Sequence, residues 1–321
     1  MSRFEVKLHA NNLTFSAYSS YTEHQLAQVT PDRIILLLHG FPDTRQSFDE
    51  IWPILEKKYP APSTLLLAPS LRGYEPETVL PSRLSYTPTD IASDVIGWIK
   101  EIIGDKKIPV HLIGHDWGAL ATFRTASLQP DLITSISTLA IPYMVNLSPL
   151  ELLWHVPEQI YLSSYMVRMQ TSYFYGSRLY EDAVTTVVGA QGKERKVLPY
   201  IEYLWKYWSP GWKFTQDELA DFCEAVQKPG VVDATTGYYR SLAAKRDRYW
   251  RVDFNKVPGL LIGGRDDGCM SYRLYDLQRE KLAPYGENVK IALVDKVGHF
   301  MHRENPVTIA ELCIDWIDSH E

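Results

Sequence analysis

Short runs of leucine and β-branched residues alternate along the chain with stretches of helical character, and this alternation constrains the fold more than any other feature. The clearest run is residues 33–38, Arg-Ile-Ile-Leu-Leu-Leu. Runs of this kind with helices between them are typical of a mostly parallel sheet wrapped by helices. We therefore predict an α/β fold with a mostly parallel sheet flanked by helices.

Six runs are predicted to be parallel strands: residues 33–38, 64–68, 110–113, 136–140, 259–262 and 290–294. Residues 5–8 and 13–18 precede them and are predicted to form an antiparallel edge. The last helix is predicted to begin at Pro306 after Asn305 as its cap, because one face then carries apolar residues. These residues are Ile309, Leu312, Cys313, Trp316 and Ile317.

Between Tyr143 and Trp250 the alternation of strands and helices stops. This segment holds twelve of the twenty tyrosines and five of the nine tryptophans, and its pattern is mostly helical. A segment of different composition, with sheet strands before and after it, indicates an insertion. We predict an α/β core made of residues 1–142 and 251–321 and a helical cap domain of residues 143–250. The aromatic side chains of such a cap would roof an apolar pocket.

The charge balance of the chain bears on its partners. The 321 residues suffice for one or two domains, and the formal net charge is −6. This charge gives no basic field, so we expect a small apolar molecule as partner and neither nucleic acid nor a membrane. Three widely spaced cysteines and an N-terminus without an apolar leader favour a cytoplasmic protein with reduced thiols. The sequence leaves open whether the protein is a monomer or a homodimer.

The motif Gly114-His115-Asp116-Trp117-Gly118 stands between the predicted strand at 110–113 and an apolar helix at 119–128. It resembles the G-x-S-x-G turn of the α/β hydrolases, in which a sharp bend presents a nucleophile, with aspartate in the serine position. The two glycines give the backbone room for this turn. A carboxylate that attacks an sp³ carbon forms an alkyl ester, whereas attack on an ester would form a mixed anhydride. Asp116 is therefore predicted to act on epoxides or carbon–halogen bonds. The alternative is an aspartate that caps the following helix.

In the α/β-hydrolase fold the nucleophile is followed along the chain by an acid and then a histidine. Gly264-Arg265-Asp266-Asp267 follows the strand at 259–262, and Gly298-His299-Phe300 follows the strand at 290–294. These segments resemble the acid loop and the histidine loop of that family. The resemblance assigns Asp267 as the acid and His299 as the base, with Asp266 as the alternative acid.

Three further histidines lie near these motifs. His39 and His115 flank the predicted site, and we expect each to hydrogen-bond the backbone and not to titrate in catalysis. His302 is expected to lie at the surface or where a helix approaches. A lone histidine after a strand is usually structural, so His299 stands out only through its order after the nucleophile and the acid.

His39-Gly40-Phe41-Pro42 directly follows the most apolar predicted strand. In this fold that position supplies the second backbone donor of the oxyanion hole. The implied donors are the amides of Phe41 and Trp117.

The HGFP, LRGY (residues 71–74), GHDWG and GHF motifs together resemble the α/β-hydrolase-fold epoxide hydrolases along essentially the whole chain. That family carries two cap tyrosines that hydrogen-bond the epoxide oxygen. Residues 164–170 and 237–240 are similar to the two tyrosine segments, which selects Tyr165 and Tyr239, with Tyr161 and Tyr238 as alternatives. The resemblance implies no cofactor and no metal. Ser70 before the LRGY motif, where the family often has aspartate, departs from the pattern and bears on the shape of the pocket.

The resemblance therefore predicts hydrolysis of an epoxide to a vicinal diol through an ester on Asp116. Dehalogenases of the same fold share several of these motifs, and a haloalkane or haloacid dehalogenase with the same Asp-His-Asp machinery is the nearest alternative. Those enzymes hold the halide with indole or amide N–H groups, often from the residue after the His-Gly pair. Here that residue is Phe41, which has no side-chain donor, while Trp117 suits either activity. A small-molecule binding protein without turnover is the alternative from another class.

Overall fold

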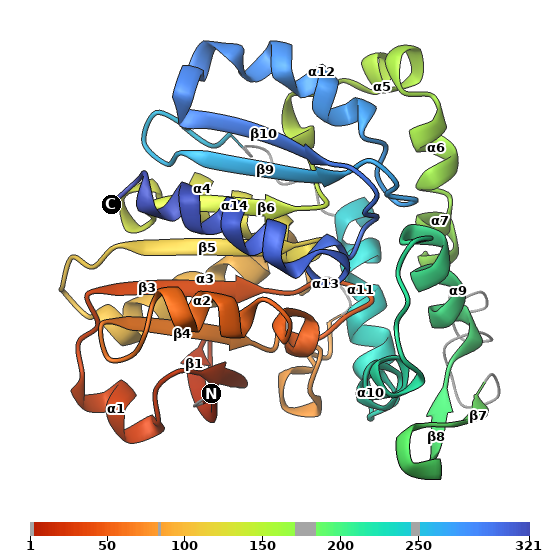
Figure 1. Cartoon of the computed structure of the whole chain (residues 1–321), viewed down its shortest axis with the longest axis horizontal. Helices are drawn as coiled ribbons and strands as arrows, with labels where there is room; N and C mark the ends of the chain where they lie inside the picture. The colour runs from red at the N-terminus through yellow and green to blue at the C-terminus, as the bar shows by residue number, and fades with distance from the viewer. Residues whose placement is uncertain (1–2, 83–84, 171–183, 245–250) are drawn as a thin grey trace.

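The computed structural model describes residues 3–82, 85–170, 184–244 and 251–321, and its central element is an eight-stranded sheet (Figure 1). The strand order is β1-β2-β4-β3-β5-β6-β9-β10. The strands are β1 Phe4–Ala10, β2 Leu13–Ser19, β3 Arg33–Leu38, β4 Thr64–Pro69, β5 Val110–His115, β6 Ser135–Leu139, β9 Gly259–Gly264 and β10 Val289–Val294. β1 and β2 pair antiparallel with each other, β2 pairs antiparallel with β4, and the remaining pairs are parallel. The predicted α/β class and antiparallel edge are confirmed.

Helices cover both faces of the sheet because alternate strand residues point to opposite sides. In β3, Ile34, Leu36 and Leu38 pack with α3 (Pro88–Ile103) and α4 (Trp117–Leu128). Ile35 and Leu37 pack on the other face with α2 (Trp52–Lys58) and α14 (Pro306–Asp318). Figure 1 shows α2 and α14 in front of the sheet and α3 and α4 behind it. The other α-helices described in the core are α1 Glu23–Gln28, α12 Arg273–Leu282 and α13 Met301–Glu304.

The last helix forms as its sequence predicts. The Asn305 side chain accepts a hydrogen bond from the Thr308 amide, and Pro306 occupies the first turn, where its missing N–H costs no helical hydrogen bond. Of the predicted apolar face, Ile309, Cys313, Trp316 and Ile317 are buried against the sheet.

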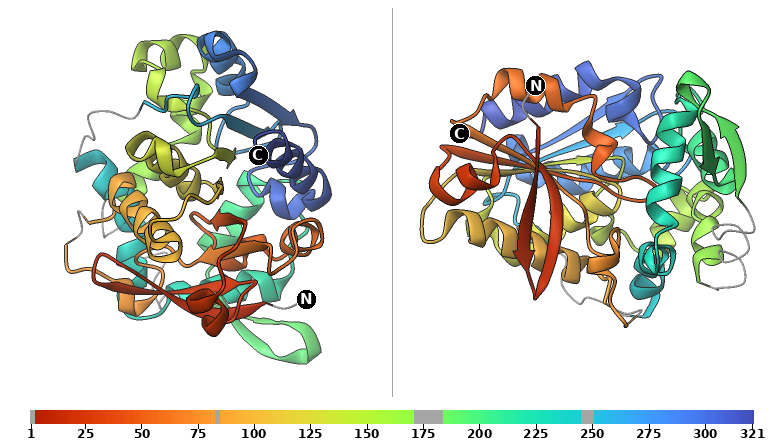
Figure 2. Two further views of the ribbon diagram at one scale, coloured as in Figure 1. Left: turned by 90° about the vertical axis from the view of Figure 1, so that its left-hand side faces the viewer. Right: turned by 90° about the horizontal axis from the view of Figure 1, so that it is seen from below.

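Between β6 and β9 the chain leaves the sheet and forms a cap at the carboxyl ends of the strands (Figures 1 and 2). Its helices are α5 Pro149–His155, α6 Glu158–Leu162, α7 Tyr165–Met169, α9 Pro199–Trp208, α10 Gln216–Val226 and α11 Val231–Ala244. The cap also contains a two-stranded hairpin of β7 (Thr185–Val188) and β8 (Glu194–Val197), which the sequence pattern did not predict. The predicted cap boundary at residue 250 lies outside the described residues.

The described ranges contain no helix that combines the length and the apolar character needed to cross a membrane. Each of the three cysteines, Cys223, Cys269 and Cys313, is buried and unpaired.

Candidate active site

A sharp turn joins β5 to α4 and places Asp116 at its apex. Asp116 has φ 52° and ψ −116°, a backbone conformation that is costly for a residue with a side chain. The flanking glycines leave no room for a Cβ: one on Gly118 would lie 1.9 Å from the carbonyl oxygen of Leu38, and one on Gly114 would lie 2.3 Å from that of Gly118. The predicted need for glycine at both positions is confirmed.

The Asp116 side chain does not serve the helix that it precedes. It makes no capping hydrogen bond to α4, so the alternative in which Asp116 is merely a helix cap is wrong. Instead its Oδ1 accepts a hydrogen bond of 2.7 Å from the Phe41 amide. A Cβ built on Gly40 would lie 2.5 Å from both Asp116 Oδ1 and the Trp117 nitrogen, so only glycine at this position leaves room for the turn. The role of both amides as oxyanion donors stays a prediction.

His299 lies between two carboxylates. Its Nδ1 donates to Asp267 Oδ2 at 3.0 Å, and its Nε2 lies 3.7 Å from Asp116 Oδ2, which is longer than a hydrogen bond. Among the described residues Nε2 has no hydrogen-bond partner, which leaves this nitrogen free to bind a water molecule.

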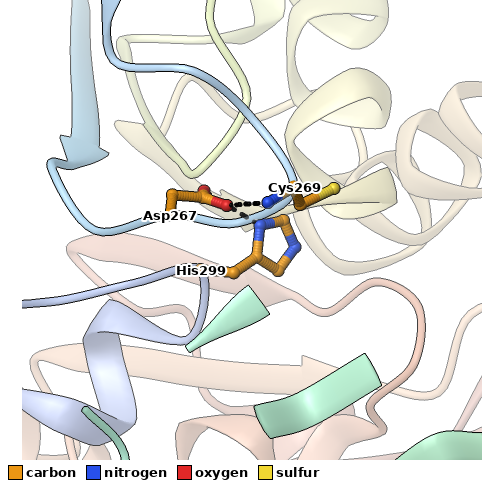
Figure 3. Close-up of side chains that lie close together, drawn as sticks. All are labelled: Asp267, Cys269 and His299. Carbon is orange, nitrogen blue, oxygen red and sulfur yellow. Dashed lines mark hydrogen bonds and ion pairs between the residues drawn. The ribbon is translucent and has the colours of Figure 1, made fainter. Parts of the chain in front are cut away.

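The loop after β9 presents Asp267 to the histidine. Asp267 Oδ1 accepts from the amides of Cys269 (2.7 Å) and Met270 (3.0 Å), which leaves Oδ2 for His299 (Figure 3). Asp266, the alternative acid, is exposed. The structure thus brings Asp267, and not Asp266, to the imidazole.

The charges around His299 determine its protonation. Burial would lower the pKa of His299, but the carboxylates of Asp267 and Asp116 outweigh burial and raise this pKa to about 10. His299 is therefore protonated at neutral pH in the substrate-free protein.

The other histidines near the site stay neutral. His39 Nε2 accepts from the Leu71 amide at 3.1 Å, and burial lowers the pKa of His39 to about 3. His115 Nε2 donates to the His299 carbonyl at 3.0 Å, and burial lowers the pKa of His115 well below its usual value. Both bond the backbone as expected. The expectation of a surface position for His302 is wrong: His302 is fully buried in α13, where Ser47 Oγ is 2.5 Å from its Nε2.

Two cap tyrosines lie across the cavity from the turn. Tyr165 begins α7 and Tyr239 lies in α11, and their rings meet edge to face at 5.6 Å between centroids. The Tyr239 hydroxyl is buried without a hydrogen-bond partner among the described residues, and the Tyr165 hydroxyl lies 3.5 Å from Cys269 Sγ. Burial raises the pKa of both phenols well above 10, so both hydroxyls stay protonated and can donate.

The alternative tyrosines are placed differently. The Tyr238 hydroxyl donates to the Arg72 carbonyl at 2.6 Å, and Tyr161 is 70% exposed. This geometry favours Tyr165 and Tyr239, whose roles stay predictions.

A cavity of about 690 Å³ separates the turn from the cap. Its walls are mostly apolar, and among the described residues no lysine or arginine lines it. An apolar wall with a few polar groups is typical of small-molecule sites. The lining residues are Asp116, Trp117, Leu120, Ile141, Met144, Val145, Leu152, Gln159, Ile160, Ser163, Tyr165, Met166, Tyr239 and Met270.

The end of α9 holds the loops of both Asp267 and His299, which the sequence did not indicate. The Trp208 carbonyl accepts from the amides of Gly268 (3.1 Å) and His299 (3.0 Å). Ser209 Oγ accepts from the Phe300 amide at 2.9 Å. A backbone carbonyl can belong to any residue type, so no residue pattern marks it.

Asp267, Cys269 and His299 also form a group with potential metal-ligand atoms within 4.8 Å of one another (Figure 3). Asp267 and His299 use these atoms in their mutual hydrogen bond. Burial raises the pKa of the Cys269 thiol well above its usual value, which disfavours the thiolate that metals bind. The chemistry of this group therefore suits hydrogen bonding better than metal ligation.

Comparison with known proteins finds relatives along most of the chain. Residues 35–312 match the model of the alpha/beta hydrolase family. The AB hydrolase superfamily protein YfhM of Bacillus subtilis (strain 168) is 27% identical over 289 residues, which cover 88% of this chain and 90% of that protein. Epoxide hydrolase A of Mycobacterium tuberculosis (strain ATCC 25618 / H37Rv) is 22% identical over 316 residues, which cover 90% of this chain and 91% of that protein.

A solved structure shares the fold. It is a mutant of an epoxide hydrolase from Bacillus megaterium complexed with its product, a naphthyloxy-propane-1,2-diol. It matches with a TM-score of 0.71 at 18% identity, over 98% of this chain and 100% of that one.

Proposed function

The chain belongs to the alpha/beta hydrolase family, and on this premise we propose that it hydrolyses an apolar epoxide to a vicinal diol through an ester on Asp116. One observation carries the proposal. The turn that presents the nucleophile in this fold holds a carboxylate, and two tyrosine hydroxyls line the same apolar cavity. A carboxylate nucleophile suits an sp³ carbon, and phenol donors suit an oxygen leaving group.

The first half-reaction opens the epoxide. Asp116 Oδ1 is held by the Phe41 amide, so Oδ2 is the oxygen available to attack an epoxide carbon. As the new carbon–oxygen bond forms, the carbon–oxygen bond of the ring breaks, and its electron pair moves to the epoxide oxygen. That oxygen takes a proton from Tyr165 or Tyr239, because an alkoxide is a poor leaving group without a donor. The product of this step is a hydroxyalkyl ester of Asp116.

The second half-reaction releases the diol. A water molecule beside His299 Nε2 attacks the ester carbonyl carbon while His299 takes its proton, and Asp267 steadies the imidazolium. Esterification removes the charge of Asp116 and with it one of the two carboxylates that raise the pKa of His299. With its pKa lowered, His299 passes its proton to the tyrosinate that protonated the epoxide, which restores the phenol and leaves a neutral His299 as the base.

The protons and oxygens of the cycle balance. One proton of the water passes through neutral His299 to the departing alcohol oxygen, and the other, left on the Asp116 carboxyl, returns to His299 and restores the starting charges. One oxygen of Asp116 leaves in the diol, and the water oxygen replaces it in the carboxylate. The net reaction is the addition of one water to one epoxide.

The relatives support this proposal. The match to epoxide hydrolase A of Mycobacterium tuberculosis covers 90% of this chain. The Bacillus megaterium enzyme holds a diol as its product. Dehalogenation through the same Asp116 ester is the alternative, and the Trp117 side chain in the cavity wall is the observation that favours it. A halide leaves without a proton, so that activity gives the two tyrosine hydroxyls no task.

The proposal is tested with a panel of neutral epoxides and haloalkanes, product analysis, and intact mass of His299→Gln. We expect diol formation by the wild type and, in the variant, an adduct equal to the mass of the whole epoxide. An adduct lighter by hydrogen halide would assign dehalogenation. Single turnover in ¹⁸O water should give unlabelled diol first, and labelled diol in the first turnover would contradict the ester. No conversion of any substrate would favour a binding protein.

A further inference from the structure

Gln159 in the cap binds the loop that carries the acid. It is 4% exposed and is the one buried residue of α6. Its Nε2 donates to the Cys269 carbonyl at 3.0 Å, and its Oε1 accepts from the Ser271 amide at 2.9 Å. Both ends of one side-chain amide therefore hold the segment 267–271, which we call the acid loop.

The acid loop connects Gln159 to the side chains of Asp267 and His299. The peptide groups that follow Asp267 bind its Oδ1 through the Cys269 and Met270 amides, and its Oδ2 binds His299. Gln159 fixes the carbonyl of Cys269 in the same stretch. The position of Gln159 thus bears on the direction in which the Asp267 carboxylate points.

The same contact extends to the first half-reaction. Cys269 Sγ lies 3.5 Å from the Tyr165 hydroxyl, and Tyr165 follows α6 in the chain at the start of α7. Gln159 Nε2 also donates to Ser163 Oγ at 2.9 Å, between α6 and α7. One side chain therefore links the acid loop to the segment that carries a proposed epoxide-binding tyrosine.

We propose that Gln159 is a positioning residue that couples the cap to the acid, so that Asp267 orients His299 only while α6 is docked on the acid loop. This inference rests on the proposed function for its catalytic meaning. A catalytic pair held by a mobile element completes its geometry when that element closes, which is a recurring use of caps and lids. Here the closing element would be α6, and its docking would complete the pairing of Asp267 with His299, the base that activates water for hydrolysis of the ester.

The hydrogen bonds of Gln159 satisfy two buried peptide groups of the acid loop. The Cys269 carbonyl and the Ser271 amide lie in a buried part of the loop, and a buried peptide group without a partner is unfavourable. Without the Gln159 amide, the loop would gain by turning these groups towards water. That movement would carry the Cys269 amide away from Asp267 and weaken the pairing of Asp267 with His299.

The test is an NMR titration of the His299 imidazole in the substrate-free protein, comparing the wild type with Gln159→Met. Methionine keeps the length of glutamine and removes both hydrogen bonds. The His299 signal is assigned by its loss in His299→Gln. We expect the pKa of His299 to fall by roughly one unit in Gln159→Met, because Asp267 would stand farther from the imidazole.

The titratable groups that face His299 define what else could move its pKa. Asp116 and His115 face it from β5 and the turn, Asp267 and Cys269 from the acid loop, and His302 and Glu304 from α13. Asp267 and Cys269 belong to the loop that Gln159 binds, and burial raises the pKa of the Cys269 thiol, which keeps it uncharged. A shift in Gln159→Met therefore reports on Asp267.

Glu158→Gln is the matched control. Glu158 precedes Gln159 in the same helix, pairs with Arg273 at 3.1 Å and accepts from Ser271 Oγ at 2.8 Å. Glutamine keeps an acceptor for Ser271 and removes the ion pair, so this variant weakens cap docking without freeing the Cys269 carbonyl. We expect an unchanged pKa of His299. A shift equal to that of Gln159→Met would overturn the proposal in favour of a general effect of docking.

A kinetic experiment separates the two half-reactions. In Gln159→Met the alkyl-enzyme formed from an epoxide should hydrolyse roughly tenfold more slowly, because Asp267 would no longer orient the imidazole and steady its imidazolium. Should Gln159→Met fail to fold, Gln159→Leu also removes both hydrogen bonds, adds no charge near His299, and serves in its place. A folded variant with an unchanged pKa of His299 overturns the coupling. A shifted pKa in a protein that converts no epoxide leaves the coupling intact and rejects the proposed function.

Discussion

The two segments of the cap are attached to the molecule in opposite ways. The α9–α11 segment (residues 199–244) buries large aromatic side chains, among them Trp205, Trp208, Phe222 and Tyr238. The helices of the α5–α7 segment (residues 149–169) bury only Gln159 and Met169. The α5–α7 segment instead exposes apolar side chains: Leu150, Leu153, Trp154, Ile160 and Val167.

Their contacts with the core differ in the same sense. Trp205 of the α9–α11 segment donates its indole N–H to the Pro42 carbonyl at 2.9 Å, and Glu218 pairs at 2.7 Å with the buried Arg303. Apart from Gln159, the α5–α7 segment is tied down by ion pairs at the surface, such as Glu158 with Arg273. Surface ion pairs contribute little to stability because water screens them.

The cavity therefore has one firmly attached wall formed by α9–α11, here called the fixed wall. Its other cap wall is formed by the weakly attached α5–α7 and is here called the adjustable wall. Tyr239 stands on the fixed wall, with its ring against Trp117, whereas Tyr165 stands on the adjustable wall. Ile160 lines the cavity and is also 58% exposed, so the apolar lining continues to the surface through the α5–α7 segment. Under the proposed function, this favours entry of the epoxide past α5–α7 and its binding against α9–α11.

The largest effect is expected where neither cap segment contributes, at the nucleophile. Asp116→Ala removes the attacking oxygen and should lower diol formation on the order of 10⁴-fold or more. The side chain makes no cap bond to α4, so circular dichroism should remain that of the wild type. Diol formation at a rate near that of the wild type would mean that water attacks the epoxide directly.

The attachment of the two segments should appear in thermal or chemical unfolding. Trp205 is fully buried, and Trp205→Ala should destabilise the protein by about 3–5 kcal/mol. Trp154 is 83% exposed, and Trp154→Ala should change stability by less than about 0.5 kcal/mol. Equal losses in the two variants would contradict the contrast between the segments.

Tyrosine-to-phenylalanine variants test whether both cavity walls contribute to the first half-reaction. Tyr239→Phe or Tyr165→Phe removes about 1.5–3 kcal/mol of charge-assisted hydrogen bonding, roughly a ten- to hundredfold loss in alkylation rate. The double variant should be nearly inactive. Because alkylation itself is slowed, no ester should accumulate, unlike in His299→Gln. Undiminished alkylation by the double variant would remove both hydroxyls from the mechanism and favour dehalogenation.

A smaller effect is expected in the pH dependence of stability, through His299. Its pKa is raised to about 10 in the folded protein, above the usual 6.5. The raised pKa stabilises the fold fully below pH 6.5, and this contribution is lost as the pH rises towards 10. The melting temperature of the wild type, relative to His299→Gln, should therefore fall by a few degrees over this range. A melting-temperature difference that stays constant with pH would mean that the two carboxylates do not raise the pKa of His299.

The core could be predicted from the sequence because its signals are local. Residues 33–38 form β3 with the predicted boundaries, and Gly114 and Gly118 lie where the backbone of the turn is crowded. Asp267 and His299 were found because they follow Asp116 in the order that the α/β-hydrolase fold uses, each in a motif that comes after a predicted strand.

What the sequence could not indicate depends on partners distant in the chain. His302 is buried beside Ser47, which is 255 residues away, so its own neighbours gave no reason to expect burial. Gln159 acts through backbone groups of the acid loop, and the Trp208 carbonyl could belong to any residue. The β7–β8 hairpin is partly exposed and polar, without the strong alternation that marks the strands of the sheet.

The Trp208 carbonyl, which holds the loops of both Asp267 and His299, has a consequence for the order of biosynthesis. Asp116 and the cap leave the ribosome before Gly268 and His299, the two residues whose amides this carbonyl accepts. Until they arrive, the Trp208 carbonyl lacks both of these donors, and under the proposed mechanism Asp116 has no partner that could activate a water molecule. Under that mechanism, a chain halted before His299 that folded around its pocket would react with a single epoxide molecule and retain it. Such a truncated product would be a covalent trap for the epoxide instead of a catalyst.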